Sequence, residues 1–93
     1  GSFSEIDIYP NPFILGADAG SLTIDGLIQN TSIRIYSVSG NLIKEFNSPG
    51  GRIAFWDGKD TYGNFVSTGI YILVAYDAEA NNVKTTKIAV IKR

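Results

Sequence analysis

Histidine, cysteine and methionine are all absent from the 93-residue sequence. Without histidine no side chain ordinarily titrates near neutral pH, and without cysteine there is no thiol nucleophile. Transition-metal sites also lose nearly all of their usual ligands. Most classes of enzyme are therefore excluded. The lack of cysteine also rules out a small secreted fold held together by disulfides, although it assigns no cellular compartment.

The sequence also lacks an excess of either charge, since eight Lys and Arg residues stand against nine Asp and Glu residues and leave a net charge of −1. Proteins that bind phosphate backbones or anionic lipid surfaces carry a basic excess, so we expect no nucleic-acid partner. The longest apolar run, residues 70–76, is far shorter than the ~20 residues that a membrane-spanning helix needs. We therefore expect no insertion into a membrane.

A chain of this length builds one hydrophobic core, and no repeat, low-complexity tract or linker divides the sequence. Gly1 and Ser2 precede the first patterned residue and are typical of a cloning scar. We therefore expect a single domain over residues 3–93, taken from a longer protein.

Residues that favour strands dominate what is present, with 13 Ile, five Val, six Thr, five Tyr and five Phe. Alternation of period two and turn signals predict seven strands, at residues 4–9, 20–25, 33–36, 42–46, 52–56, 69–77 and 83–91. Seven short strands in a chain of this length, with a tryptophan in mid-chain, favour an all-β fold. We predict an immunoglobulin-like β-sandwich of antiparallel strands rather than a closed barrel.

Two of these segments carry a further expectation. Gly40 and Asn41, which tolerate a positive φ, lie between the third and fourth predicted strands, so we expect those strands to pair as a hairpin. Residues 69–77 have bulky apolar residues at consecutive positions. That pattern predicts a strand at the centre of a sheet, covered on both faces.

The last predicted strand carries Lys84, Lys87 and Lys92, which we expect to keep its polar side in water. The ordinary role of such a basic edge is to prevent pairing with other strands. The alternative is a recognition surface that a partner reads by charge or by adding a strand to the open edge. An open edge of this kind would also permit weak self-association.

Residues 9–13, with the sequence YPNPF, end the first predicted strand, because two prolines fix φ and lack an amide donor. A rigid bend with a buried Phe13 anchoring the turn is the structural account of this segment. Tyr71 follows Gly69 at the entry to the apolar strand. We expect its hydroxyl to tie down a corner of the sandwich.

Asp57, Asp60 and Asn64 lie in a polar loop that contains glycines, and carboxylate and amide oxygens suit calcium. Their spacing does not match the EF-hand pattern, and the same residue types form ordinary turns, so we expect no metal and no cofactor. No cleft-forming insertion supports a catalytic carboxylate pair, and no Ser-Lys signature is present. We expect a protein that is not an enzyme.

Aromatic side chains offer one more possibility, a platform on which sugars stack. Its candidate members are Tyr36, Trp56, Tyr62, Phe65 and Tyr76. A sandwich of this size, however, needs most of its aromatic side chains in the core.

Four segments, taken in order, resemble one known family. They are residues 9–13 (YPNPF), 33–40 (IRIYSVSG), 56–58 (WDG) together with 69–72 (GIYI), and 87–92 (KIAVIK). The set closely resembles the type A C-terminal sorting domain of the type IX secretion system, from about residue 6 to the end of the chain. The resemblance implies an immunoglobulin-like sandwich that directs a fused N-terminal cargo protein through the outer-membrane translocon of a Gram-negative bacterium.

The resemblance also implies partners and a location. A cell-surface sortase generally removes such a domain and attaches the cargo to lipopolysaccharide, so the cargo passes the periplasm and is secreted or displayed at the surface. In the family the final residues matter most for export. The residues implied in translocon recognition are Lys84, Lys87, Ile88, Val90, Lys92 and Arg93, supported by Tyr9, Pro10, Asn11, Pro12, Phe13, Gly40, Trp56, Gly69 and Tyr71.

A second resemblance concerns the middle of the chain. Residues 56–60 (WDGKD), followed by Gly63 and Asn64, look like the immunoglobulin-like domain of the flagellar hook-capping protein. That domain does not usually begin with YPNPF or end in a strand bracketed by lysines, so the two ends favour the sorting domain. The alternative function is a structural or adhesive module, hook-capping-like or a carbohydrate-binding appendage.

Overall fold

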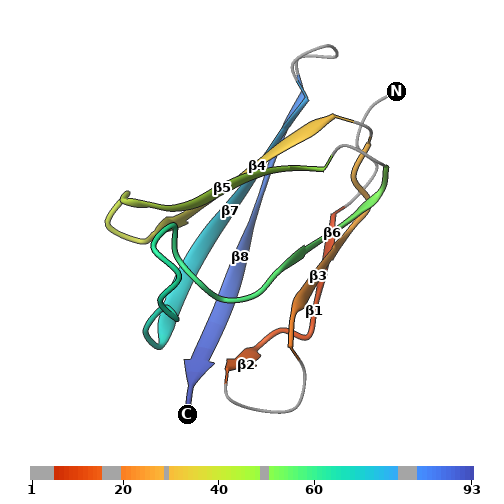
Figure 1. The fold of residues 1–93 in the computed structure, drawn as a ribbon. Helices are drawn as coiled ribbons and strands as arrows, with labels where there is room; N and C mark the ends of the chain where they lie inside the picture. Colours follow the sequence, from red (N-terminus) through yellow and green to blue (C-terminus); the bar gives the residue numbers. More distant parts are fainter. Residues whose placement is uncertain (1–5, 16–19, 29, 49–50, 78–81) are drawn as a thin grey trace.

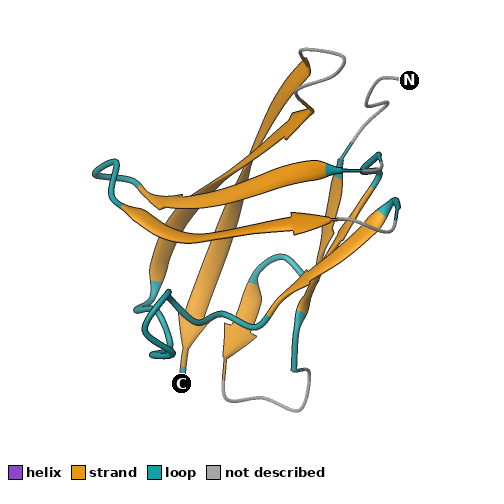
Figure 2. Ribbon diagram, turned by 45° about the horizontal axis from the view of Figure 1, so that its top comes forward, coloured by secondary structure: helices purple, strands orange, loops and turns teal. Residues whose placement is uncertain are grey.

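The computed structural model describes residues 6–15, 20–28, 30–48, 51–77 and 82–93, and every regular element among them is a β-strand (Figure 1). The strands are β1 (Asp7–Tyr9), β2 (Phe13–Leu15), β3 (Leu22–Asp25), β4 (Thr31–Ser37), β5 (Leu42–Ser48), β6 (Ile53–Trp56), β7 (Gly69–Asp77) and β8 (Asn82–Lys92). They form two sheets (Figure 2), which confirms the predicted all-β, immunoglobulin-like sandwich. Within the described residues, no helix has the length and apolar character to cross a bilayer.

The two sheets differ in size. The smaller has the strand order β1-β3-β6, and the larger has the order β2-β8-β7-β4-β5. Neighbouring strands are antiparallel except β2 and β8, which run parallel. This parallel pair joins an early part of the chain to its last strand, near the C terminus at the bottom of Figure 1.

Alternation along the strands builds the core. On β4 the side chains of Ile33 and Ile35 are fully buried, whereas Arg34 between them is exposed. Burying a large apolar side chain contributes about 1.5–3 kcal/mol. The largest fully buried apolar residues are Trp56, Phe13, Leu22, Ile24, Ile33, Ile35, Leu73, Ile88 and Val90.

The predicted hairpin is confirmed. β4 and β5 pair antiparallel, with a register shift between Ile35 and Tyr36. In the connecting turn Gly40 has a φ of 93°, and its amide donates a hydrogen bond of 3.0 Å to the carbonyl of Ser37. Glycine adopts this backbone conformation without the steric cost that a Cβ would bring.

The predicted number of strands is wrong, because β2 is an additional strand. Phe13 does not merely anchor a turn; it is fully buried and begins a three-residue strand. So short an element contains too few residues for a period-two pattern. Its partner β8 lies at the other end of the chain, so no local signal marks the pairing.

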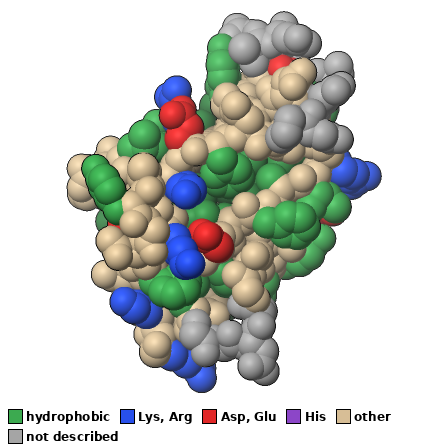
Figure 3. Space-filling model, viewed as in Figure 1, with side chains coloured by type: hydrophobic (Ala, Val, Ile, Leu, Met, Phe, Trp, Pro, Cys, Tyr) green, Lys and Arg blue, Asp and Glu red, His purple; other side chains and the backbone are tan. Residues whose placement is uncertain are grey.

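β7 is the middle strand of the larger sheet, as predicted. The expectation that both of its faces are covered is wrong. Tyr71, Leu73 and Ala75 point inward and are buried, whereas Ile70 and Tyr76 on the outer face are 43% and 39% exposed. Hydrophobic side chains also reach the surface elsewhere, interspersed with charged ones (Figure 3).

β8 carries its lysines on two faces rather than one. Ile88 and Val90 point into the core, so alternation places Lys84 and Lys92 on that same side, beyond the ends of the core, and Lys87 on the outer face. The expectation of a single polar side is therefore wrong. β8 is also not an edge strand, since it lies between β7 and β2, although β2 covers only its C-terminal end.

Candidate recognition surface

The proline bend and the last strand lie against each other. The side chain of Asn11 accepts a hydrogen bond of 3.0 Å from the amide of Ala89 and donates one of 3.4 Å to the carbonyl of Lys87. An asparagine side chain holds both an acceptor and a donor, so it bonds a strand edge as a backbone segment does. The peptide bonds Tyr9-Pro10 and Asn11-Pro12 on either side are both cis. Asn11 thus occupies the edge of β8 just before β2 continues the pairing.

The end of β8 is held by two further contacts. The amide of Lys92 donates a hydrogen bond of 2.8 Å to the hydroxyl of Thr68. The amide of Arg93 donates one of 3.3 Å to the carbonyl of Leu15, at the end of β2. We call the bonds of Asn11, Leu15 and Thr68 to residues 87–93 the terminal clasp. The clasp fixes the backbone at the end of the chain, while the side chains of residues 91–93 stay exposed.

Three aromatic side chains from different motifs pack together beside the clasp. The ring centroids of Phe13 and Trp56 are 6.1 Å apart, and those of Trp56 and Tyr71 are 6.2 Å apart. The indole N–H of Trp56 donates to the carbonyl of Lys59 at 3.0 Å. The hydroxyl of Tyr71 donates to the carbonyl of Ser67 at 2.7 Å, which confirms its predicted role at a corner. Burial raises the pKa of Tyr71, and this outweighs the opposing effect of the bond to Ser67.

Gly58, in the loop after β6, touches β2. A Cβ added at this position would lie 2.3 Å from Cδ2 of Leu15 and 3.3 Å from Cε2 of Phe13. The φ of Gly58 is 81°, a conformation that residues with a Cβ rarely adopt. Glycine therefore satisfies two requirements here, and the WDG segment is joined sterically to the strand that pairs with β8.

The predicted recognition residues differ in what they can present to a partner. Ile88 and Val90 are buried, so they act by fixing the strand. Lys84 is exposed but lies about 26 Å from Lys92 along the strand. The exposed cations at the clasp end are Lys87, Lys92 and Arg93.

None of the cations of β8 takes part in an ion pair within the described part of the chain. The ion pairs there join Arg34 to Glu45 at 2.6 Å and Arg52 to Asp25 at 2.9 Å, on other strands. The hydrogen bond that Arg34 donates to Glu45 raises the pKa of Arg34, and the bond that Arg52 donates to Asp25 lowers the pKa of Asp25. Among the described residues, therefore, no carboxylate neutralises Lys87, Lys92 or Arg93, and such positive charge is suited to an acidic surface.

Most of the supporting motif residues converge on β8. The bend around Asn11 bonds to it directly, and Gly69 and Tyr71 lie opposite Val90 and Ile88 on the neighbouring strand. Three residues lie elsewhere. Trp56 is on β6 of the smaller sheet, where its ring packs against Phe13 and Tyr71. Tyr9 is 48% exposed at the end of β1, and Gly40 lies in the β4–β5 turn.

The polar loop after β6 uses its acidic side chains in turns. One carboxylate oxygen of Asp57 accepts a hydrogen bond of 3.0 Å from the amide of Lys59. One of Asp60 accepts bonds of 2.9 Å and 3.0 Å from the amides of Tyr62 and Asn64. These are the turns that aspartate commonly stabilises. Among the described residues, no three potential metal-ligating side chains lie together.

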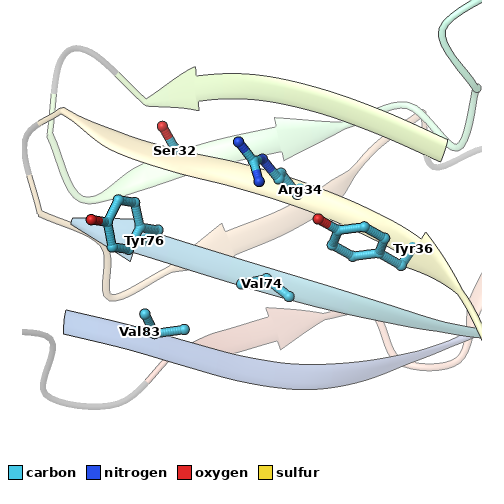
Figure 4. Close-up of a pocket in the computed structure, with 6 residues that line it drawn as sticks. All are labelled: Ser32, Arg34, Tyr36, Val74, Tyr76 and Val83. Atoms are coloured by element: carbon cyan, nitrogen blue, oxygen red, sulfur yellow. The ribbon is translucent and has the colours of Figure 1, made fainter. Parts of the chain in front are cut away.

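A hollow of about 290 Å³ lies on the outer face of the larger sheet (Figure 4). Its lining residues are Ser32, Arg34, Tyr36, Val74, Tyr76 and Val83. Of the aromatic residues considered for sugar stacking, Tyr36 and Tyr76 lie here, and Trp56 is in the core. Tyr62 and Phe65 are 86% and 49% exposed. The expectation that most aromatic side chains of the domain lie in the core is wrong, since among the described residues the buried ones are Phe13, Trp56 and Tyr71.

Two solved structures of type IX secretion proteins are similar to this chain. PorZ, an essential bacterial surface component of the type IX secretion system of Porphyromonas gingivalis, matches 92% of the chain with a TM-score of 0.80 and 28% sequence identity. Dimeric latent PorU from the same bacterium matches 95% of the chain with a TM-score of 0.64 and 19% identity. The chain spans 11% of that PorZ chain and 9% of that PorU chain.

CopC from Methylosinus trichosporium OB3b matches 96% of this chain, over 96% of its own length, with a TM-score of 0.51 and 13% identity, and so shares the fold alone. No protein-family model matches the sequence, and no curated protein does. The likeness to PorZ links the chain to the type IX secretion system, and the likeness to PorU, at 19% identity, shows that the fold is shared. The likeness to PorZ confirms the resemblance that the four motifs indicated.

Proposed function

We propose that this domain is the C-terminal sorting domain of a larger exported protein, that the type IX translocon recognises it, and that a surface sortase then processes it. The observation that carries the proposal is the likeness to PorZ over 92% of the chain. The terminal clasp supports it, because the bend and the last strand, two motifs far apart in the sequence, meet there. The domain itself is proposed to be non-catalytic and to need no cofactor.

The clasp end of β8 has the properties of a recognition element. Lys87, Lys92 and Arg93 present positive charge on a backbone that Asn11 and Thr68 hold in place. Positive charge steers an acidic partner surface and increases the rate of encounter. Ordering these residues in advance also lowers the entropy lost on binding. A component of the translocon with an acidic surface is therefore the proposed partner.

A reporter fusion tests the sorting role. Residues 3–93 are placed after a signal peptide and a fluorescent protein, and the fusion is expressed in a host with the type IX translocon and in a translocon-null strain. We expect the reporter outside the wild-type cells and in the periplasm of the null strain. Sortase processing would shorten the exported form by up to 10.1 kDa, the mass of this chain. A folded reporter that stays in the periplasm of both strains would contradict the proposal.

Charge reversal tests the proposed recognition element, the exposed cations at the clasp end of β8. The double variant Lys87→Glu/Lys92→Glu should reduce export about tenfold while leaving the fold intact, since surface substitutions usually cost less than ~0.5 kcal/mol. The matched control is Lys44→Glu/Lys59→Glu, which changes the net charge equally on β5 and in the loop after β6. Equal loss of export in the two variants would show that total charge is read, and not this surface.

One observation favours a second candidate function, an adhesive module. Tyr36 and Tyr76 both line the hollow on the outer face of the larger sheet, and tyrosine rings suit contact with sugar rings. If the reporter fusion fails, binding to a glycan array with loss of the signal in Tyr76→Ala would support this alternative.

A further inference from the structure

The two sheets end in four edge strands, and three of these carry features that oppose pairing with another strand. β1 and β2 are each three residues long and flank the proline bend. β5 carries the charged residues Lys44 and Glu45, and a register shift disturbs its pairing with β4. Natural sheets use short length, charge and irregularity to protect their edges.

β6, the remaining edge strand, is also short, but it carries none of the other protective features. Its four residues include no charge, proline or glycine, and its pairing with β3 runs without a shift. Ile53 and Phe55 point away from the core and are 44% and 62% exposed. A pocket of about 340 Å³, lined in part by Phe46, Phe55 and Trp56, lies next to this strand. Such an edge is suited to accept a further strand.

The backbone groups of Ile53 and Phe55 face this open edge. The carbonyl of Arg52 accepts a hydrogen bond of 2.9 Å from the amide of Leu27, so it points to the β3 side. Successive residues of a strand direct their N–H and C=O groups to opposite edges. The N–H and C=O groups of Ile53 and Phe55 therefore point away from β3, where a second strand would meet them.

We propose that β6 pairs antiparallel with β6 of a second copy of this chain, so that the two smaller sheets join into one. A two-fold axis perpendicular to the sheet passes beside Ala54 and keeps the outer faces of both copies on the same side. Ile53 of each copy then lies opposite Phe55 of the other, and the two residues exchange both backbone hydrogen bonds. Their exposed side chains form an aromatic and β-branched cross-strand pair, a favourable combination.

The charges beside the strand favour this orientation and this occupant. Arg52 precedes β6 and Asp57 follows it. Arg52 already makes an exposed ion pair with Asp25 at 2.9 Å, and antiparallel pairing brings Asp57 of the other copy near the same guanidinium, at both ends of the contact. Parallel pairing would bring like charges together. Because one segment supplies both halves of the contact, a second copy is the occupant that we propose for this edge.

Sedimentation velocity and light scattering test the dimer from about 10 µM to about 1 mM, the range in which weak contacts become populated. We expect the mass to rise from 10.1 kDa towards twice that value. Phe55→Lys and Ile53→Lys should each raise the dissociation constant at least about tenfold, because they place charge in the apolar pair. Tyr62→Lys, at an exposed aromatic residue away from β6, is the control and should leave it unchanged. Circular dichroism verifies that each variant is folded.

Cysteine pairing tests the register, since the chain has no cysteine of its own. Ile53→Cys and Phe55→Cys proteins are oxidised separately and as a mixture. Directly opposite residues are about 5.5 Å apart between Cα atoms, within the range that a disulfide spans. The mixed disulfide should therefore form faster than either symmetric one. Three results would each overturn the proposal. The protein could remain monomeric throughout the concentration range, or the dissociation constant of the dimer could be unchanged by Phe55→Lys. The symmetric disulfides could also form as fast as the mixed one. None of these results bears on export, because Lys87 and Lys92 lie on the other sheet.

Discussion

The side-chain oxygen of Asn11 lies 3.0 Å from the amide nitrogen of Ala89, although 78 residues separate the two along the chain. The side chain of Asn11 also donates a hydrogen bond to the carbonyl of Lys87. It thus bonds to the backbone of β8 directly before the point where β2 begins to pair with that strand. The bend at the start of the domain thereby stabilises the strand that we propose the translocon reads.

Removing the Asn11 side chain should loosen the end of β8. Asn11→Ala is expected to lower the free energy of unfolding by about 0.5–1.5 kcal/mol, the net value of a typical hydrogen bond, and to speed hydrogen exchange at the Ala89 amide. Asn11→Asp keeps the acceptor and should retain most of that protection. Residue-resolved hydrogen exchange by NMR checks the prediction, and unchanged protection of Ala89 in Asn11→Ala would contradict it.

Alanine at Gly58 should destabilise the domain more than alanine at Gly63. Both glycines have positive φ, 81° and 87°, at which a Cβ costs about 1–2 kcal/mol. Only at Gly58 would the Cβ also meet Leu15, at 2.3 Å, whereas no atom lies within 4 Å at Gly63. The difference between the two variants should be about 1–3 kcal/mol, the usual cost of overpacking. Urea unfolding measures it, and equal midpoints would mean that Leu15 moves aside without strain.

Tyr71 should make the fold sensitive to alkaline pH. Its pKa is raised above the ordinary value of 10.0, so its contribution is complete below that pH and is lost as the pH rises through the higher, folded-state value. Tyr71→Phe should remove this dependence and cost about 1 kcal/mol at neutral pH, because the bond to Ser67 is lost. Tyr62→Phe, at a residue that is 86% exposed, should change neither. Thermal unfolding across the alkaline range distinguishes the two variants.

Asp25 should contribute to the loss of stability in acid. The hydrogen bond from Arg52 lowers its pKa, so its contribution is present above the ordinary value of 3.8 and is lost as the pH falls through the lower, folded-state value. Asp25→Asn should flatten the acid limb of the stability curve. Because the pair is exposed, added salt should reduce the difference between the variant and the native chain. Unfolding midpoints measured at low and high salt test both statements.

Elements whose signal is local could be predicted from the sequence. The β4–β5 hairpin follows from Gly40 and Asn41 between two apolar segments, and the central place of β7 follows from its apolar character. The corner bond of Tyr71 spans only four residues, so it was open to prediction as well. β2 was not, since three residues show no period and their partner is the last strand of the chain.

The candidate surface was predictable only in part. The lysines of β8 were identified, but their faces depend on knowing that Ile88 and Val90 point inward. In the clasp, Asn11 accepts a hydrogen bond from the amide of Ala89, 78 residues away. Thr68 accepts one from the amide of Lys92, 24 residues away. No local sequence pattern predicts a hydrogen bond over such a separation, because both bonds form only when the two sheets have packed together.

The parallel direction of β2 and β8 has a mechanical consequence. Tension that draws the proline bend one way and the C-terminal end of β8 the other slides the two strands lengthwise past each other. The bonds that Leu15 and Asn11 make to the last strand are then stretched together, whereas a hairpin pulled open at its ends would lose its bonds one after another. If force were applied to the domain through its last strand, the contact between β2 and β8 would therefore be loaded in shear. Its hydrogen bonds would have to break together.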